Sequence, residues 1–228
     1  MTRLSIIVSL LIIVLGLFLM PLRFAISHAN IADLSAKNIE GTIWTGHIGD
    51  AHYRQFPIGN VKAGLSFSSL LSANPKISFE RALSPGYSQI SGAIGSSGID
   101  AFNGQLDMKD LLAPLPIDAI IMRDAGFEFN NENCIAASGK VRALMRINID
   151  GTPLSRDLEG PLECVSGKLR AALKGKTGSE RLTIDIDAVG AYSADIILLG
   201  NYPISAEYEA QGFRKTSDGI GMSLKGSL

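Results

Sequence analysis

Two hydrophobic patterns divide this chain. Residues 4–22 (LSIIVSLLIIVLGLFLMPL) form one apolar run without a charged side chain. Farther along, apolar and polar positions alternate, and in residues 141–150 (VRALMRINID) every odd position is apolar. A period of two is typical of a β-strand that turns one face to a core and the other to water. The patterns therefore predict an N-terminal apolar helix followed by a mainly β domain.

The β domain is expected to be an antiparallel, curved, multi-stranded sheet. Shorter alternating segments occur at residues 61–67, 90–94, 169–173, 181–188 and 220–224. Glycines separate many of these segments at a spacing that suits hairpins, and short strands joined by tight turns form antiparallel sheets. Two stretches, 31–37 and 107–112, are compatible with short helices, and Pro114 would stop the second of them.

The apolar run is long enough to cross a membrane. At about 1.5 Å per residue, a helix over residues 4–22 approaches the roughly 30 Å of a bilayer core. Arg3 and the amino terminus favour a cytoplasmic N-terminus. We therefore predict an uncleaved, single-pass transmembrane anchor at residues 1–24 and an exported β-domain at 25–228, which the prolines near 113–117 could subdivide. The alternative is a cleaved signal peptide, because Ser27-His28-Ala29 offers a small-x-small processing site.

The charge balance excludes two classes of partner. The 228 residues hold 21 basic and 22 acidic side chains, so there is no cationic excess to attract a nucleic acid. Residues 1–24 contain two arginines and no acid, which leaves 19 basic and 22 acidic residues and a net charge of −3 in the rest of the chain. A mildly acidic domain does not dock on anionic lipid headgroups through a basic patch.

Cysteine usage agrees with export. The two cysteines, Cys134 and Cys164, both lie in the exported part, and an even pair in an oxidising compartment is most simply one disulfide. The functional alternative is a redox-active pair, which the absence of a C-x-x-C spacing disfavours.

Searches for catalytic motifs mostly return negatives. The chain has no G-x-S-x-G, P-loop or H-E-x-x-H motif. His47, Asp50 and His52 could in principle bind a metal, but on a continuous strand positions 47 and 52 point to opposite faces. Asp185 and Asp187 share a strand face, and their alternation with apolar residues assigns them to the solvated side. We therefore predict no catalytic, cofactor-binding or metal-binding residue, no cofactor, and no enzymatic activity.

Longer segments, in their order along the chain, carry a family resemblance. The segments are Met20–Ala25 (MPLRFA), Leu34–Gly46 (LSAKNIEGTIWTG), Phe56–Gly59 (FPIG), Asn133–Gly139 (NCIAASG), Gly160–Cys164 (GPLEC), Ala210–Arg214 (AQGFR) and Asp218–Leu228 (DGIGMSLKGSL). Together they resemble the type II secretion system protein N family, with its G-T-[IL]-W-[ST]-G signature, its L-P-[LI]-G turn and two cysteine segments. The positions carried over are the signature turn, Gly41, Thr42, Trp44 and Gly46, and the pair Cys134 and Cys164.

The resemblance implies a non-enzymatic accessory or assembly component of the type II secretion machine. Such a protein is anchored in the bacterial inner membrane with its β-domain in the periplasm, and its partners are other inner-membrane secretion components. Residues 53–55 (YRQ) depart from the family pattern, where a tryptophan-containing segment is common. Free sheet edges suit strand addition by a partner.

A second function class fits the same plan. AsmA-like lipid-transfer proteins also combine one membrane anchor with a long curved sheet, whose apolar concavity holds acyl chains. Small and branched apolar residues on the strand faces are compatible with such a groove. An open apolar groove would favour lipid transfer, and a filled core would favour a protein-binding scaffold. A periplasmic hydrolase is disfavoured because no nucleophile and base are found.

Overall fold

The computed structural model describes residues 2–28, 34–53, 56–65, 76–82, 88–95, 97–109, 112–130, 132–149, 152–200, 209–210 and 212–227. These residues fall into two compact units, Met1–Ser96 and Ser97–Leu228. Both contain antiparallel β-strands, which confirms the mainly β, antiparallel part of the predicted fold class. Residues 113–116 lie inside the second unit, between two of its strands, and Ile117 begins the second of these strands. The limits 1–24 and 25–228 stay predictions.

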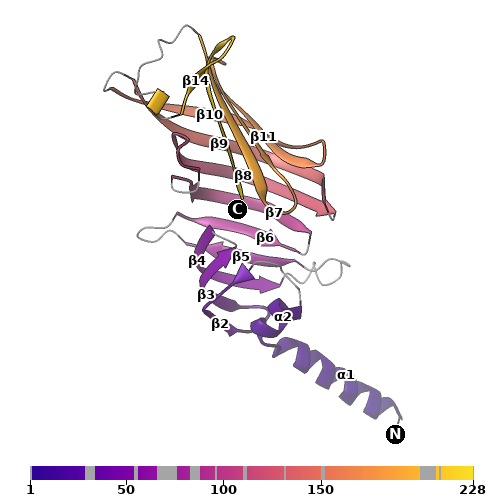
Figure 1. Cartoon of the computed structure of the whole chain (residues 1–228). Helices are drawn as coiled ribbons and strands as arrows, with labels where there is room; N and C mark the ends of the chain where they lie inside the picture. Colours follow the sequence, from indigo (N-terminus) through magenta and orange to yellow (C-terminus); the bar gives the residue numbers. More distant parts are fainter. Residues whose placement is uncertain are drawn as a thin grey trace. The chain divides into compact units, whose positions relative to one another are not determined.

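The first unit places two helices before a small sheet. Its elements are α1 (Thr2–Phe18), α2 (Leu22–His28), β1 (Leu34–Ser35), β2 (Asn38–Gly41), β3 (Gly46–Tyr53), β4 (Phe56–Leu65), β5 (Ile77–Arg81) and β6 (Ile90–Ile94). The strands follow the order β1-β3-β4-β5-β6, and β2 also pairs with β3. α2 lies beside β2 (Figure 1).

The expected single helix over residues 4–22 is wrong in its bounds. α1 ends at Phe18 and α2 begins at Leu22, and Pro21 between them forms an isolated β-bridge with Thr42. The physical reason is Pro21, which has no N–H to donate and whose ring blocks the preceding turn of a continuous helix. No helix among the described residues has both the length and the apolar character to cross a membrane.

The second unit is a longer sheet. Its strands are β7 (Gly98–Asp107), β8 (Ile117–Asn130), β9 (Asn133–Ile149), β10 (Thr152–Val165), β11 (Lys168–Gly175), β12 (Glu180–Ile186), β13 (Ala191–Leu199), β14 (Arg214–Lys215) and β15 (Gly219–Ser227). From β7 to β13 each strand pairs with the next along the chain, and β15 then pairs with β13 and carries β14 at its outer edge. The sheet is open and curved, and the colours of Figure 1 follow its strands in order.

One face of this second sheet forms a filled core. Leu173, Leu182, Ile196 and Met222 are cross-strand neighbours on β11, β12, β13 and β15, and all four are buried. Burial alternates along these strands as the sequence pattern predicts, so the polar positions between them face outward. Within the described residues, the alternating segments found in the sequence fall on strands, except that Asp187 and Ala188 at the end of segment 181–188 follow β12 and belong to a turn.

Neither predicted short helix forms in the described residues. Leu34 and Ser35 belong to β1, so the helix expected at 31–37 is wrong there, and residues 31–33 lie outside the described ranges. Asp107 ends β7, Met108 and Lys109 are not helical, and residues 110–111 lie outside the described ranges. The Leu112 amide donates to the Met108 carbonyl at 2.9 Å. Short stretches have too few hydrogen bonds to fix a helix without tertiary support.

Candidate functional site

The turn between β2 and β3 contains the GTIWTG signature. Gly41 ends β2 with a φ of 87°, a left-handed conformation that favours glycine. The Thr42 amide donates to the Thr45 carbonyl at 3.2 Å, and the Thr45 amide approaches the Thr42 hydroxyl at 3.4 Å. A Cβ on Gly41 would stand 2.5 Å from the Thr45 carbonyl oxygen. The signature glycine is therefore required by the geometry of this tight turn.

This turn holds the chain where it leaves α1. The Ile43 amide donates to the Met20 carbonyl at 2.9 Å, and Leu22 and Ile43 are 0% and 1% exposed. A Cβ on Gly46 would stand 2.3 Å from Cδ2 of Leu22, so the second signature glycine leaves the space that this leucine fills. The ring of Trp44 lies 5.5 Å from that of Phe18, the last residue of α1. The signature turn is thus a docking site for residues 18–22.

A neighbouring strand completes the docking site. The Leu65 amide of β4 donates to the Ile43 carbonyl at 2.6 Å. Gly64 is equally constrained, because a Cβ there would stand 2.5 Å from the Trp44 carbonyl oxygen. Sequence reasoning missed both Leu22 and Gly64, since neither belongs to the signature and only the folded chain brings them to it.

Cys134 and Cys164 form a disulfide, in agreement with the sequence prediction. Their Cα atoms are 5.4 Å apart and their separation in sequence is 30 residues. They lie near one end of the β9–β10 hairpin, where the Cys134 amide also donates to the Gly167 carbonyl at 2.8 Å. The bond therefore fixes the start of β9 to the end of β10, and a chain-entropy estimate for such a loop is about 3–4 kcal/mol.

The histidine arrangement differs from the expected one. The pairing of β3 with β4 shifts register between Ile48 and Ala51, and Asp50 adopts a φ of 52°. Because Ile48 and Ala51 are both buried, the irregularity places His47 and His52 on the same outer side, contrary to the parity argument. Nδ1 of His52 lies 3.0 Å from the Asp50 carbonyl. No group of three or more His, Cys, Asp or Glu side chains that could hold a metal occurs among the described residues.

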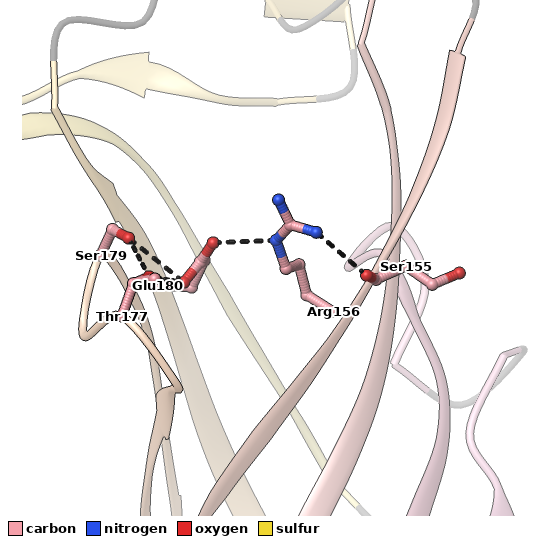
Figure 2. Close-up of polar contacts among 5 residues, drawn as sticks. All are labelled: Ser155, Arg156, Thr177, Ser179 and Glu180. Atoms are coloured by element: carbon pink, nitrogen blue, oxygen red, sulfur yellow. Dashed lines mark hydrogen bonds and ion pairs between the residues drawn. The ribbon is translucent and has the colours of Figure 1, made fainter.

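A polar cleft opens at one end of the second unit. Its volume is about 500 Å³, and it is lined by Ser155, Arg156, Asp157, Lys176, Thr177, Ser179 and Glu180. Figure 2 shows Arg156 reaching from β10 to Glu180 at the start of β12, where Nε and Oε1 are 3.2 Å apart. The Thr177 and Ser179 hydroxyls donate to the other carboxylate oxygen at 3.2 and 3.4 Å.

Arg156 and Glu180 occupy strand positions on the same face as the core residues. Glu180 shares its strand face with Leu182 and Ile184, and its side chain is only 9% exposed. Arg156 shares the parity of the buried Leu158. The pair therefore closes this end of the apolar face with a satisfied charge. Sequence reasoning missed this pair. The available signal was Glu180, an acidic residue in the same alternating register as the apolar Leu182 and Ile184.

Asp185 lies on the outer face, as the sequence predicts, yet it is far from freely solvated. The Arg170 guanidinium donates to both of its oxygens at 2.6 and 2.8 Å, and the Asp185 side chain is 15% exposed. This hydrogen bonding, followed by the attraction of the two charges, raises the pKa of Arg170 above its usual value. The two residues are cross-strand partners on β11 and β12, so the contact is part of the sheet's outer surface.

Comparison with known protein families gives a match. A model of the type II secretion system (T2SS), protein N, matches residues 32–198. That range includes the signature turn, both cysteines and the polar cleft. No curated protein and no solved structure matches this chain.

Proposed function

Since the chain belongs to the type II secretion system protein N family, we propose that it is a non-enzymatic accessory or assembly component of the secretion machine. Family membership carries this proposal, because the family is that of a protein of the type II secretion system. The β-units supply surfaces for other components, and open sheet edges are the parts of those surfaces best suited to bind them.

We further propose that the apolar segment at residues 4–22, most of which forms α1, anchors the protein in the inner membrane. Large apolar side chains of α1 point outward, among them Ile7, Leu11 and Leu15 at 59–67% exposure. Side chains of this kind favour lipid over water by about 25 cal/mol for each Å² transferred. Arg3 at the amino end favours a cytoplasmic N-terminus. The signature turn then holds the sheet of the first unit directly against the end of the anchor.

The periplasm is the proposed location of both β-units. The Cys134–Cys164 disulfide supports this, because such bonds form and persist in oxidising compartments and are rare in the cytosol.

Filled packing favours a protein scaffold over lipid transfer. The inward side chains of β10 to β13 include Leu158, Leu173, Leu182 and Ile196, each at most 1% exposed. Acyl chains need an apolar groove that side chains leave open, whereas the cleft of the second unit is lined by charged and hydroxyl side chains. Stoichiometric phospholipid bound to the purified protein, measured by mass spectrometry, would reverse this preference.

The anchor is tested by replacing residues 1–24 with a cleavable signal peptide. The intact chain is expected in the membrane fraction and the replaced chain in the soluble periplasmic fraction. A matched control keeps the natural residues 1–24 and changes Ser27 to Leu, which removes the small residue of the candidate processing site. Recovery of the intact chain as a soluble, shortened protein would support the cleaved signal peptide instead.

The assembly role is tested by photocrosslinking in intact membranes. A photoreactive residue at Lys225, on the last strand of the second sheet, is expected to capture another secretion component. The control position is Lys174 on β11, which has a strand on each side. If no sheet-edge position captures any secretion protein, the assembly role is wrong.

A further inference from the structure

One strand of the second sheet runs beyond its neighbour. β10 pairs with β9 from Thr152 onward, but its pairing with β11 begins only at Leu158. Over Thr152–Asp157 no described strand pairs with the other edge of β10. These six residues span about 20 Å at 3.3 Å per residue, and we call them the open edge.

The prolines of β10 show which backbone groups face the open edge. Pro153 and Pro161 have no N–H, and both keep their places in the ladder with β9. A proline within a strand is tolerated where its nitrogen points away from the ladder partner. Odd-numbered residues of β10 therefore point their N–H and C=O groups away from β9, and Ser155 and Asp157 are the odd residues of the open edge that retain an N–H. In agreement, the Ser155 carbonyl accepts a hydrogen bond at 3.3 Å from Arg156, whose side chain reaches toward β12.

The polar cleft lies beside the open edge. The cleft of about 500 Å³ is bounded on one side by Ser155, Arg156 and Asp157 and on the other by residues 176–180. The Arg156–Glu180 contact crosses it and keeps the two sides connected (Figure 2). Gly175 leaves room for that contact, because a Cβ there would stand 2.3 Å from Oε2 of Glu180. One side of the cleft thus carries backbone N–H and C=O groups of β10 that no described strand pairs with. The other side is formed by residues 176–180, which the Arg156–Glu180 contact holds in place.

Among the four charged side chains that line the cleft, Lys176 is the one without a partner among the described residues. Asp157 pairs with Arg142 at 2.8 Å, and Glu180 pairs with Arg156 at 3.2 Å. Lys176 is exposed and makes no hydrogen bond or ion pair with any described residue. A ligand carboxylate would complete this set of charges at little desolvation cost, because Lys176 is already in water.

We propose that the open edge of β10 binds an extended, acidic peptide segment of another secretion component as an added strand. The segment hydrogen-bonds to the outward backbone groups of Ser155 and Asp157, and one of its carboxylates pairs with Lys176. This inference rests on the proposed assembly function and names the surface that carries it out.

The backbone contact is tested with Ser155→Pro in the full-length protein, isolated from membranes through an affinity tag. This substitution removes one outward N–H but leaves the ladder to β9 intact, as Pro153 does two residues earlier. The matched control is Ser155→Ala, which keeps the N–H. We expect the amount of co-isolated secretion component to fall about tenfold in Ser155→Pro, the loss of one intermolecular hydrogen bond, and to stay within about twofold in Ser155→Ala.

The outcomes separate this site from the assembly role. If Ser155→Pro has the same midpoint of urea unfolding as Ser155→Ala and still co-isolates the component at the wild-type level, the open edge is not the site. If photocrosslinking captures the component from position 225 but not from position 155, the assembly role stands and the site is wrong. If neither position captures a secretion component, both fail. If Ser155→Pro unfolds, photocrosslinking from a photoreactive residue at position 155, which keeps the N–H, decides alone.

The charge contact is tested with Lys176→Glu against Lys168→Glu, an exposed lysine at the opposite end of β11. Both changes alter the net charge equally. Crosslinking from position 155 is expected to fall about threefold to fivefold in Lys176→Glu only, and the difference is expected to shrink at high salt. Equal effects of the two substitutions would show that the peptide segment is not acidic.

Discussion

The two units hold their sheets by different means. In the first unit, Leu22 from the segment after α1 belongs to the buried core and packs against the signature turn. In the second unit, apolar side chains from successive long strands bury one another, and a disulfide joins β9 to β10. The sheet of the first unit therefore depends on the chain that precedes its strands, whereas the second unit has a core built from its own strands. In the proposed function, the first unit couples the protein to its membrane anchor, and the second unit provides a stable platform for partners.

The two units also differ in how their buried charged side chains are satisfied. Arg81 of the first unit is 7% exposed and donates to the backbone carbonyls of Ile58 and Ser88. Glu180 of the second unit is met by a guanidinium and two hydroxyls from its own sheet. The arginine ties irregular chain to a small sheet, and the glutamate closes the end of a long one.

The largest effect is expected for the core of the second unit. Ile196 and Ile197 are adjacent on β13, but they are 0% and 36% exposed. Ile196→Ala is expected to lower the free energy of unfolding by about 3–4 kcal/mol, through lost burial and a cavity, and Ile197→Ala by less than about 1 kcal/mol. Urea unfolding of the purified protein measures both. Similar losses would show that this face is not the core.

Removing the disulfide is expected to have the next largest effect. Cys134→Ala with Cys164→Ala should cost about 3 kcal/mol, because the unfolded chain gains freedom. The control is the wild-type protein unfolded with a reductant, which should approach the double variant, while the double variant itself should not respond to the reductant. A loss below about 1 kcal/mol would mean that strand pairing alone fixes this end of the hairpin.

A smaller effect is expected for the helix docking site of the first unit. In Gly46→Ala the new methyl group would overlap Leu22, and overpacking of this kind costs about 1–3 kcal/mol. Faster hydrogen exchange at the amides of residues 22–28 and 38–46 is expected, with strands β9–β13 unchanged. The control is Gly16→Ala in α1, where a Cβ meets nothing within 4 Å. Equal exchange in both variants would contradict the docking of Leu22 at the turn.

The smallest effect is expected on the outer face of the second sheet. Arg170 makes two short contacts with the mostly buried Asp185, whereas Arg142 makes a single short contact with the more exposed Asp157. Because solvent screens both pairs, Arg170→Ala should cost roughly 1 kcal/mol and Arg142→Ala roughly 0.5 kcal/mol or less. Thermal unfolding of the two variants measures the difference, and the reverse order would contradict it.

Alternation was the most informative sequence signal for the fold. In β9 the buried positions Val141, Ala143 and Met145 are those that the odd-position pattern predicts. The pattern failed in β3, where register shifts between Ile48 and Ala51 and between Ala51 and His52 accompany the burial of both Ile48 and Ala51, an even and an odd position. One extra residue in a strand leaves no clear trace in hydrophobicity, so it was invisible until pairing with β4 was known.

The candidate sites were predicted unevenly. The signature turn and the cysteine pair could be named because their residues stand close together or are few. The docking of Leu22, the Arg156–Glu180 contact and the open edge could not, because each joins segments that are distant in sequence. The open edge also depends on a difference in length between β10 and β11, which is set by pairing and not by either strand alone.

By itself, the sequence determined the mainly β class, the positions of many strands and the apolar N-terminal segment, because period and hydrophobicity are local properties of the chain. It also determined the family, through short segments in a fixed order. Only the tertiary structure decided where the apolar helix ends on the sheet, which charges are paired and which strand edge stays open. Those features depend on how strands pair. The register of a pair is set by two segments together, so it cannot be inferred from either segment alone.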